Sequence, residues 1–158
     1  MEEKEAEQIL LNRAYFFLKF RLRSEVEMQQ YLIKKAKKLQ LIESIVESVI
    51  AILKEEGLID DKKFVGAYIS QRNILKPKGE YVLRGELIKH GIAKELIDDY
   101  FLTYPINEEE LAYKILLSRW KRFKNLPPQE KYRKAINFLY RRGFSFEIAK
   151  VTYKKLVL

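Results

Sequence analysis

Apolar residues recur along the chain at intervals of three and four, the spacing that gathers side chains on one face of an α-helix. The first such segment covers about residues 5–20, and its apolar face holds Ile9, Leu10, Ala14, Phe17 and Leu18. Similar segments follow at about residues 24–36, 42–56, 61–75, 79–91, 93–103, 107–124, 128–142 and 146–156. No segment alternates apolar and polar residues as a half-buried β-strand does. The pattern therefore predicts an all-α chain of about nine helices.

Several predicted helix ends carry residues that satisfy the unpaired backbone groups of a helix terminus. Ser24, with Glu27 three residues later, forms a capping box at the start of the second segment. Asp60 and Asp61 are suited to cap the fourth segment and to place negative charge at its positive end. Gly57 ends the third, because glycine adopts the left-handed conformation at the lowest cost. These residues indicate where the helices begin and end.

The second, fifth and eighth segments share a pattern of apolar residues, two basic residues and a small residue. Aligned on Leu32, Leu87 and Leu139, the copies are Tyr31–Ala36, Glu86–Gly91 and Phe138–Gly143. The small residues lie 55 and 52 positions apart, and the first copy requires about three extra residues in the loop that follows. This register predicts three tandem three-helix repeats, at residues 1–57, 58–104 and 105–158. Repeats of this size have small cores, so we expect them to stack into an elongated, curved, monomeric molecule.

Charge and composition narrow the functional classes. The chain has 158 residues, no cysteine and a formal net charge of +9. From Leu111 to Leu158 there are 13 Lys plus Arg and two acids, so the excess positive charge lies in the last third of the chain. This polarity favours nucleic acid or an acidic protein surface as partner, and a merely solvated face is the alternative. Without cysteine, and with no apolar run near the roughly 18 residues of a membrane span, we expect a cytoplasmic protein with no membrane partner.

No group of residues resembles a catalytic or cofactor site. His90 is the sole histidine and lies at the end of a predicted helix, beside Gly91, where a cation interacts favourably with the helix dipole. The segment at residues 76–79 has lysines and a glycine but lacks the pattern of a phosphate-binding loop. Helix starts and a solvated face account for the acidic groups at residues 60–61, 98–99 and 108–110. We therefore expect a protein that is not an enzyme and that holds no metal ion or cofactor.

Aromatic residues make up 13% of the chain, and their helical spacing assigns most of them to the core rather than to a base-stacking platform. Those expected to be buried are Tyr15, Phe16, Phe17, Phe64, Tyr68, Phe101, Tyr113, Phe138, Tyr140 and Phe144. Trp120 lies in the most basic segment and is expected to be half-buried.

The candidate functional surface is basic and comes from the seventh and eighth helices and the loop between them. Its residues are Lys114, Arg119, Lys121, Arg122, Lys124, Lys131, Arg133, Lys134, Arg141 and Arg142. Arginine makes planar, bidentate contacts with phosphate or carboxylate, so the surface suits either anion. A helix-turn-helix that reads DNA sequence is the rival interpretation. For that role only Gln29 and Gln30 offer base-reading side chains on a helix, and the signal is weak.

Short motifs in a fixed order resemble those of the RecX regulatory proteins. The first is Ala14-Tyr15-x-x-Leu18, followed by Arg21-x-Arg23-Ser24-x-x-Glu27-x-x-x-x-Leu32. The second is Gly57-Leu58-Ile59-Asp60-Asp61-x-x-Phe64-x-x-Ala67-Tyr68, then Arg72, Lys78-Gly79 and Glu86-Leu87-x-x-x-Gly91-Ile92. The third is Phe138-Leu139-x-Arg141-Arg142-Gly143-Phe144-Ser145. The resemblance covers about residues 12–156, and it departs from the family pattern at Gly66, usually basic, and at Glu80, commonly proline.

The resemblance implies tandem three-helix repeats and a function as a modulator of RecA recombinase. Proteins of this family bind along the groove of the RecA–DNA filament and restrain its growth, ATP hydrolysis and strand exchange, without covalent chemistry. It therefore implies a RecA filament on single-stranded DNA as the partner. To the ten basic residues above it adds, as expected contacts from the middle repeat, Arg72, Lys76, Lys78 and Arg84. A repeat protein that binds DNA directly and a non-catalytic protein adaptor are the alternative interpretations.

Overall fold

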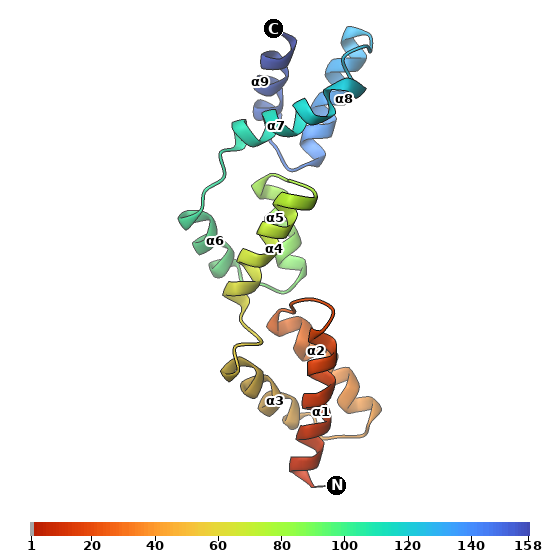
Figure 1. Ribbon diagram of the computed structural model, residues 1–158, viewed down its shortest axis with the longest axis vertical. Helices are drawn as coiled ribbons and strands as arrows, with labels where there is room; N and C mark the ends of the chain where they lie inside the picture. The colour runs from red at the N-terminus through yellow and green to blue at the C-terminus, as the bar shows by residue number, and fades with distance from the viewer. Residues whose placement is uncertain (1) are drawn as a thin grey trace. The chain divides into compact units, whose positions relative to one another are not determined.

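The computed structural model describes residues 2–158, and within that range all regular secondary structure is helical (Figure 1). The α-helices are α1 Glu3–Leu18, α2 Glu25–Lys38, α3 Ser44–Glu55, α4 Asp61–Leu75, α5 Glu80–Lys89, α6 Lys94–Thr103, α7 Glu108–Arg119, α8 Pro128–Arg141 and α9 Phe146–Val157. A 3₁₀ turn, Trp120–Arg122, follows α7. The prediction of an all-α chain is confirmed. None of these helices is long and apolar enough to cross a membrane.

The helix ends differ from the predicted ones by a few residues. The seventh helix was expected to reach residue 124, but α7 ends at Arg119, where the backbone tightens. There the N–H groups of Phe123 and Lys124 both donate to the carbonyl of Trp120, at 2.9 Å each. The first helix begins and ends two residues earlier than expected, and α2 continues two residues further, to Lys38.

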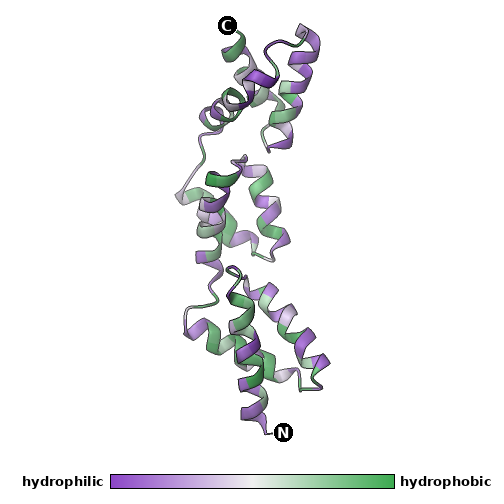
Figure 2. Cartoon of the chain, turned by 45° about the vertical axis from the view of Figure 1, so that its right-hand side comes forward, coloured by the Kyte–Doolittle hydropathy of each residue, from purple (hydrophilic) through white to green (hydrophobic). Residues whose placement is uncertain are grey.

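The residues of the chain group into two compact units, and the first comprises residues up to 67 together with residues 87–96. Helices α1, α2 and α3 of this unit pack against one another in all three pairs. Their shared core contains the fully buried side chains of Leu10, Met28, Leu32, Val49 and Leu53. Each helix contributes the apolar face that its periodicity predicts, and Figure 2 shows hydrophobic and hydrophilic residues interleaved along every helix.

The second unit comprises residues 68–86 and 97–158. Helices α7, α8 and α9 pack pairwise around a core that includes Leu116, Ala135, Leu139, Phe144 and Ala149. The division into two units interleaves along the chain, because residues 68–86 of the second lie between two segments of the first. The repeat boundaries at residues 57/58 and 104/105 stay a prediction.

Two aromatic residues that were expected in the core are exposed. Phe16 is 55% exposed and meets Phe20 edge to face, with ring centroids 5.3 Å apart. Tyr140 is 53% exposed and stacks on Phe146. Both lie on amphipathic helices, but one position off the apolar face. Trp120 is half-buried as expected.

The register of the repeats differs from the sequence alignment by one helical turn. The second helix of each repeat ends in a left-handed residue, with φ of 57° at Gln40, 83° at Gly91 and 97° at Gly143. The residue after each donates its N–H five positions back, to Ala36, Leu87 and Leu139 respectively. Gln40, and not Ala36, is therefore the counterpart of Gly91 and Gly143. The spacings become 51 and 52, and no extra residues are needed in the first loop.

In the first unit, the N-terminus of α2 meets the C-terminal end of α5. The hydroxyl of Ser24, the N-cap of α2, donates to the carbonyl of His90 at 2.5 Å. A Cβ added at Gly91 would lie 2.6 Å from Val26 Cβ, so only glycine allows this approach. The positive end of one helix thus faces the negative end of another, which is a favourable arrangement of dipoles.

Asp61 also belongs to this junction, which corrects the prediction that it caps its own helix. Its Oδ1 accepts the N–H of Glu25, the first residue of α2, at 2.8 Å. The cap of α4 is Asp60 alone, which accepts from Lys63 N–H at 3.2 Å. Burial raises the pKa of Asp61, and the hydrogen bond from Glu25 opposes that effect. A carboxylate at the start of one repeat therefore caps the second helix of the repeat before it.

The second unit contains the same junction, built at the N-terminus of α5. Gly79 N–H donates to the carbonyl of Arg142 at 2.6 Å, and a Cβ at Gly143 would lie 2.8 Å from the side chain of Val82. Glu108, at the start of α7, accepts the N–H of Glu80 at 3.0 Å. The two junctions use equivalent positions, so the repeats share tertiary contacts as well as a sequence pattern.

Candidate functional site

A group of positive side chains without acidic partners among residues 2–158 lies where α7 ends and along α8. Among residues 2–158, the following members of the predicted surface form no ion pair, and we call them the basic set: Arg119, Lys121, Arg122, Lys124, Lys131, Arg133 and Arg141. All are exposed except two that are half-buried, Arg119 and Lys131. A group of like charges without counter-ions produces a positive potential that attracts an anionic partner.

The middle-repeat candidates Arg72 and Lys78 both lie beside one carboxylate, that of Glu86. Glu86 pairs with the ammonium of Lys78, lies 4.0 Å from Arg72 Nε, and accepts the hydroxyl of Tyr68 at 2.7 Å. The Lys78 side chain is only 15% exposed. Burial alone would raise the pKa of Glu86, but the hydrogen bonds from Lys78 and Tyr68 lower it below its ordinary value. This cluster joins α4, the following loop and α5.

Removing the charge of Glu86 tests whether the cluster stabilises the fold. We expect Glu86→Gln to lower the free energy of unfolding by about 2 kcal/mol, because it leaves the mostly buried Lys78 without an anion. Urea unfolding followed by circular dichroism measures the change. The matched control is Glu95→Gln at an exposed site, which should stay within about 0.5 kcal/mol of the parent. Equal values for the two variants would contradict a structural role for Glu86.

Arg84 and Arg142 are also engaged within the second unit. Arg84 donates to Asp98 at 2.5 Å and to Glu80 at 3.1 Å, and these carboxylates raise the pKa of its guanidinium. Arg142 donates to the carbonyl of Pro77 at 3.1 Å, and burial followed by repulsion from Arg119 lowers its pKa. Both arginines thus contribute to the packing of helices, and a partner would have to compete for them.

The remaining candidates fall into two groups. Lys114 and Lys134 form exposed pairs one helical turn from Glu110 and Glu130, at 3.2 Å and 3.0 Å. Such pairs are worth little and break readily, so these lysines remain accessible to a partner. Lys76 is exposed in the loop after α4 and forms no ion pair among the described residues.

Two further cations belong to the same unit and were missing from the predicted surface. Lys150 and Lys154 are exposed on α9, and neither pairs with an acid in the part of the chain that the structure describes. The prediction stopped at Arg142, although the positive excess of the sequence continues to the end of the chain. The sequence could have indicated Lys150, because it lies four residues after Phe146 and therefore one helical turn further along the same face.

Most carboxylates of the acidic groups have structural partners. Besides the junction carboxylates, Asp98 pairs with Arg84, and Glu109 lies 3.5 Å from Lys155. Across residues 2–158, no three potential ligands among His, Cys, Asp and Glu gather as a metal site would require. These carboxylates therefore serve helix ends and ion pairs.

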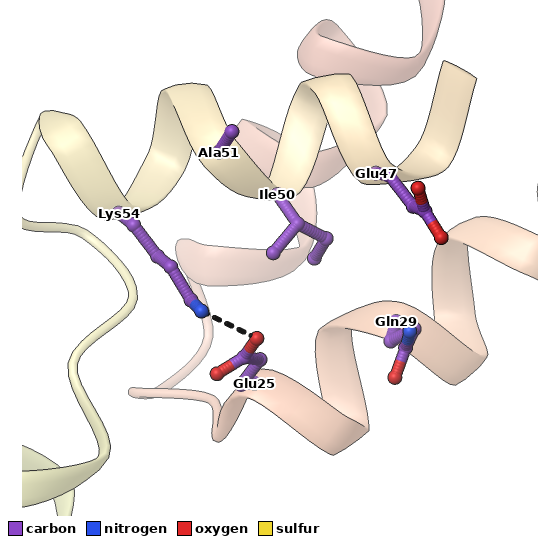
Figure 3. Close-up of a pocket in the computed structure, with 6 residues that line it drawn as sticks. All are labelled: Glu25, Gln29, Glu47, Ile50, Ala51 and Lys54. Carbon is purple, nitrogen blue, oxygen red and sulfur yellow. Dashed lines mark ion pairs between the residues drawn. The ribbon is translucent and has the colours of Figure 1, made fainter. Parts of the chain in front are cut away.

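A shallow groove of about 300 Å³ in the first unit has a different character (Figure 3). It lies between α2 and α3 and is lined by Glu25, Gln29, Glu47, Ile50, Ala51 and Lys54. Glu25 and Lys54 form an ion pair across it at 2.6 Å. Gln29, the candidate base-reading side chain, thus lies between two glutamates. Lys54 balances the charge of Glu25, but Glu47 forms no ion pair among the described residues, and its negative charge opposes an approach to phosphate, which weakens the helix-turn-helix interpretation for this helix.

His90 takes part in a network at the junction of the first unit. Its Nδ1 lies 3.3 Å from Glu27 Oε2, and Arg21 holds the same carboxylate through two hydrogen bonds. Burial would raise the pKa of Glu27, but Arg21, the N–H of Ser24 and His90 together lower it to about 2. The histidine therefore serves the packing of repeats.

Two family models match the chain. Residues 60–100 match the model described as "RecX, second three-helix domain", and residues 107–150 match "RecX, third three-helix domain". The two matches together cover more than half of the chain. They agree with the helix groups α4–α6 and α7–α9.

Curated relatives carry the same family name. "Regulatory protein RecX" of Geobacillus sp. (strain WCH70) is 37% identical over 139 residues, which is 87% of this chain and 49% of the relative. The protein of the same name from Streptococcus pneumoniae (strain Hungary19A-6) is 34% identical over 148 residues, 92% of this chain and 54% of its own length. The chain thus spans about half the length of the curated relatives it matches.

Solved structures share the fold. "Crystal structure of RecX from Lactobacillus salivarius" matches with a TM-score of 0.78 at 22% identity and covers 97% of both chains. "Crystal structure of regulatory protein RecX" matches with a TM-score of 0.74 at 24% identity, over 96% of this chain and 73% of the other. Repeats, family models and relatives agree, and the chain belongs to the RecX family of regulatory proteins.

Proposed function

We propose that this protein regulates a RecA recombinase by binding the RecA filament on single-stranded DNA and restraining its extension, ATP hydrolysis and strand exchange. Membership of a family of regulatory proteins supports the assignment of RecA as partner. The same proposal places the protein in the cytoplasm. The mechanism is physical obstruction of filament assembly, so it requires no catalytic residue.

The observation that carries the proposal is the basic set. Six predicted contact residues are engaged with acids or carbonyls of the protein itself, whereas the basic set has no such partners among residues 2–158. Its exposed members are available to carboxylates on a protein surface or to phosphates. Arg122, Arg133 and Arg141 can grip either anion with two hydrogen bonds. The basic set is therefore the surface that we assign to the filament.

The test is ATP hydrolysis by the cognate RecA in the presence of single-stranded DNA, with this protein added in increasing amounts. Obstruction of a growing filament should lower hydrolysis clearly at a few molecules per hundred RecA, because one blocked end stops many additions. No effect at any ratio would contradict regulation of RecA and leave a non-catalytic adaptor as the account.

Direct binding to DNA is the second candidate function, and the charge of the basic set favours it. A protein that merely covers DNA phosphates should inhibit only when DNA is limiting, and further DNA should restore hydrolysis. Its affinity should also fall steeply with salt, since each phosphate contact releases counter-ions. Repeating the titration with excess DNA separates the two mechanisms.

The quaternary state and the repeat boundaries are proposals as well. We infer a monomer whose three repeats are divided at residues 57/58 and 104/105. Light scattering measures the mass in solution and so tests the monomer. The ends of fragments from limited proteolysis test the repeat boundaries.

A further inference from the structure

An exposed pair of stacked aromatic rings lies where α8 ends and α9 begins. Tyr140 and Phe146 have ring centroids 4.5 Å apart and planes only 9° from parallel. Tyr140 is 53% exposed and Phe146 is 50% exposed. Each ring covers one face of the other, and about half of each residue's surface stays exposed to water. Stacked and partly exposed rings of this kind can accept a further flat ring.

Other aromatic contacts in the second unit have a different geometry. Phe123 and Phe138 lie 5.7 Å apart and are tilted by 48°, and both are largely buried. Tyr132 and Tyr153 meet edge to face at 86°. These arrangements are usual for packing within a core. Tyr140 and Phe146, by contrast, are parallel and half-exposed, so a further flat ring could stack on them in the same orientation.

The charges around the pair are positive. Arg133 lies two helical turns before Tyr140 on α8, and Arg141 is its neighbour in sequence. Lys150 lies one turn after Phe146 on α9. All three cations are exposed and form no ion pair among residues 2–158. The segment from residue 131 to 158 contains eight Lys or Arg and a single acid, Glu147, which adjoins Phe146.

We propose that the Tyr140–Phe146 pair is a stacking site for a base of single-stranded DNA, with the strand's phosphates held by Arg133, Arg141 and Lys150. Every base has a π-face, so stacking on aromatic side chains binds single strands without regard to sequence. A duplex hides those faces between neighbouring base pairs and offers only phosphates. The choice of DNA rests on the proposed function, in which the partner is a filament on single-stranded DNA.

The experiment measures binding of the whole protein to a fluorescein-labelled oligodeoxythymidylate by anisotropy, with no RecA present. The variants Tyr140→Leu and Phe146→Leu keep an apolar side chain but remove a ring. Each should weaken binding about tenfold, the loss expected for one stacked base. The variants should leave the dependence of affinity on salt unchanged, because they remove no phosphate contact. The double variant Arg133→Gln and Arg141→Gln should instead reduce that dependence.

Two controls distinguish stacking from a general effect on the fold or the charge. Phe20→Leu removes an exposed ring from the first unit and should bind as the parent does, and Tyr140→Phe should retain most of the affinity. An oligonucleotide of the same length with abasic sites should bind the parent about tenfold more weakly, and the ring variants should show no such difference. Circular dichroism confirms that each variant is folded.

Parent-like binding by the ring variants, or equal binding of normal and abasic strands, would overturn the stacking site. Because the assay contains no RecA, its result is separate from that of the hydrolysis titration. Inhibition of RecA without stacking would overturn this inference alone, and stacking without inhibition would overturn the regulatory proposal alone.

Discussion

Reversing three charges of the basic set is expected to raise the concentration that half-inhibits RecA ATP hydrolysis by about a hundredfold. The triple variant carries Arg122→Glu, Lys124→Glu and Arg133→Glu, all at exposed positions without ion pairs among residues 2–158. Each substitution replaces attraction to an anionic surface by repulsion, and the fold should tolerate it because no internal contact is broken. The measurement is the titration of RecA hydrolysis by parent and variant at one fixed salt concentration.

A matched variant separates the position of the charges from their number. Arg13→Glu, Lys34→Glu and Lys38→Glu change the net charge by the same amount, at exposed sites in the first repeat. We expect this protein to inhibit within about threefold of the parent, because these residues are not part of the basic set and salt screens exposed charges. If both triple variants lost inhibition equally, net charge and not the basic set would govern binding.

Replacing Gly91 by alanine is expected to lower the free energy of unfolding by about 3 kcal/mol. Two effects add at this residue. Its φ of 83° is strained for any residue with a Cβ, and that Cβ would lie 2.6 Å from the Cβ of Val26. The contact is with a short branched side chain that cannot swing away, so the N-terminus of α2 must shift. Urea unfolding followed by circular dichroism measures the loss.

Gly57→Ala is the control, because it imposes the same backbone strain without the collision. Gly57 has φ of 74°, and nothing lies within 4 Å of a Cβ built there. We expect a loss of about 1 kcal/mol, the cost of the left-handed conformation alone. Equal losses at the two glycines would mean that the close approach to Val26 contributes nothing to the stability of the junction.

The helices were predictable because their causes are local. Periodic apolar residues, the capping box at Ser24 and the left-handed Gly57 act within a few positions of one another, and each was found where expected. The hydroxyl of Ser24 nevertheless has a second role, towards His90. Local patterns give no sign of such a contact across 66 positions.

The register of the first repeat was missed for a physical reason. Gln40 takes the left-handed conformation that glycine takes in the other two repeats, so the pattern of small residues pointed to Ala36. Asp61 was missed in the same way, because its partner on α2 is 36 residues away. In both cases a tertiary contact, and not the local sequence, decides the role of the residue.

The candidate surface was predicted from the count of charges, which does not show which charges are already neutralised. Lys78 and Arg72 were expected to face a partner, yet Glu86 lies next to both once α4 and α5 are folded. The residues of the basic set stay without ion pairs among residues 2–158 because the sequence around them contains few acids. Its assignment to a partner therefore rests on what the fold leaves unpaired.

The interleaving of the two compact units has a consequence during protein synthesis. A nascent chain leaves the ribosome from its N-terminus, and domains generally fold as units in that order. Here the earlier unit lacks residues 87–96, including the glycine that receives α2, until the first stretch of the later unit has already emerged. A ribosome that stalls before residue 96 would expose an unfinished α2 terminus together with a stretch that still awaits its own partners. Neither unit is one continuous segment of the chain, so the first is complete only after residue 96 has emerged, and the second only after the segment that starts at residue 97 has followed.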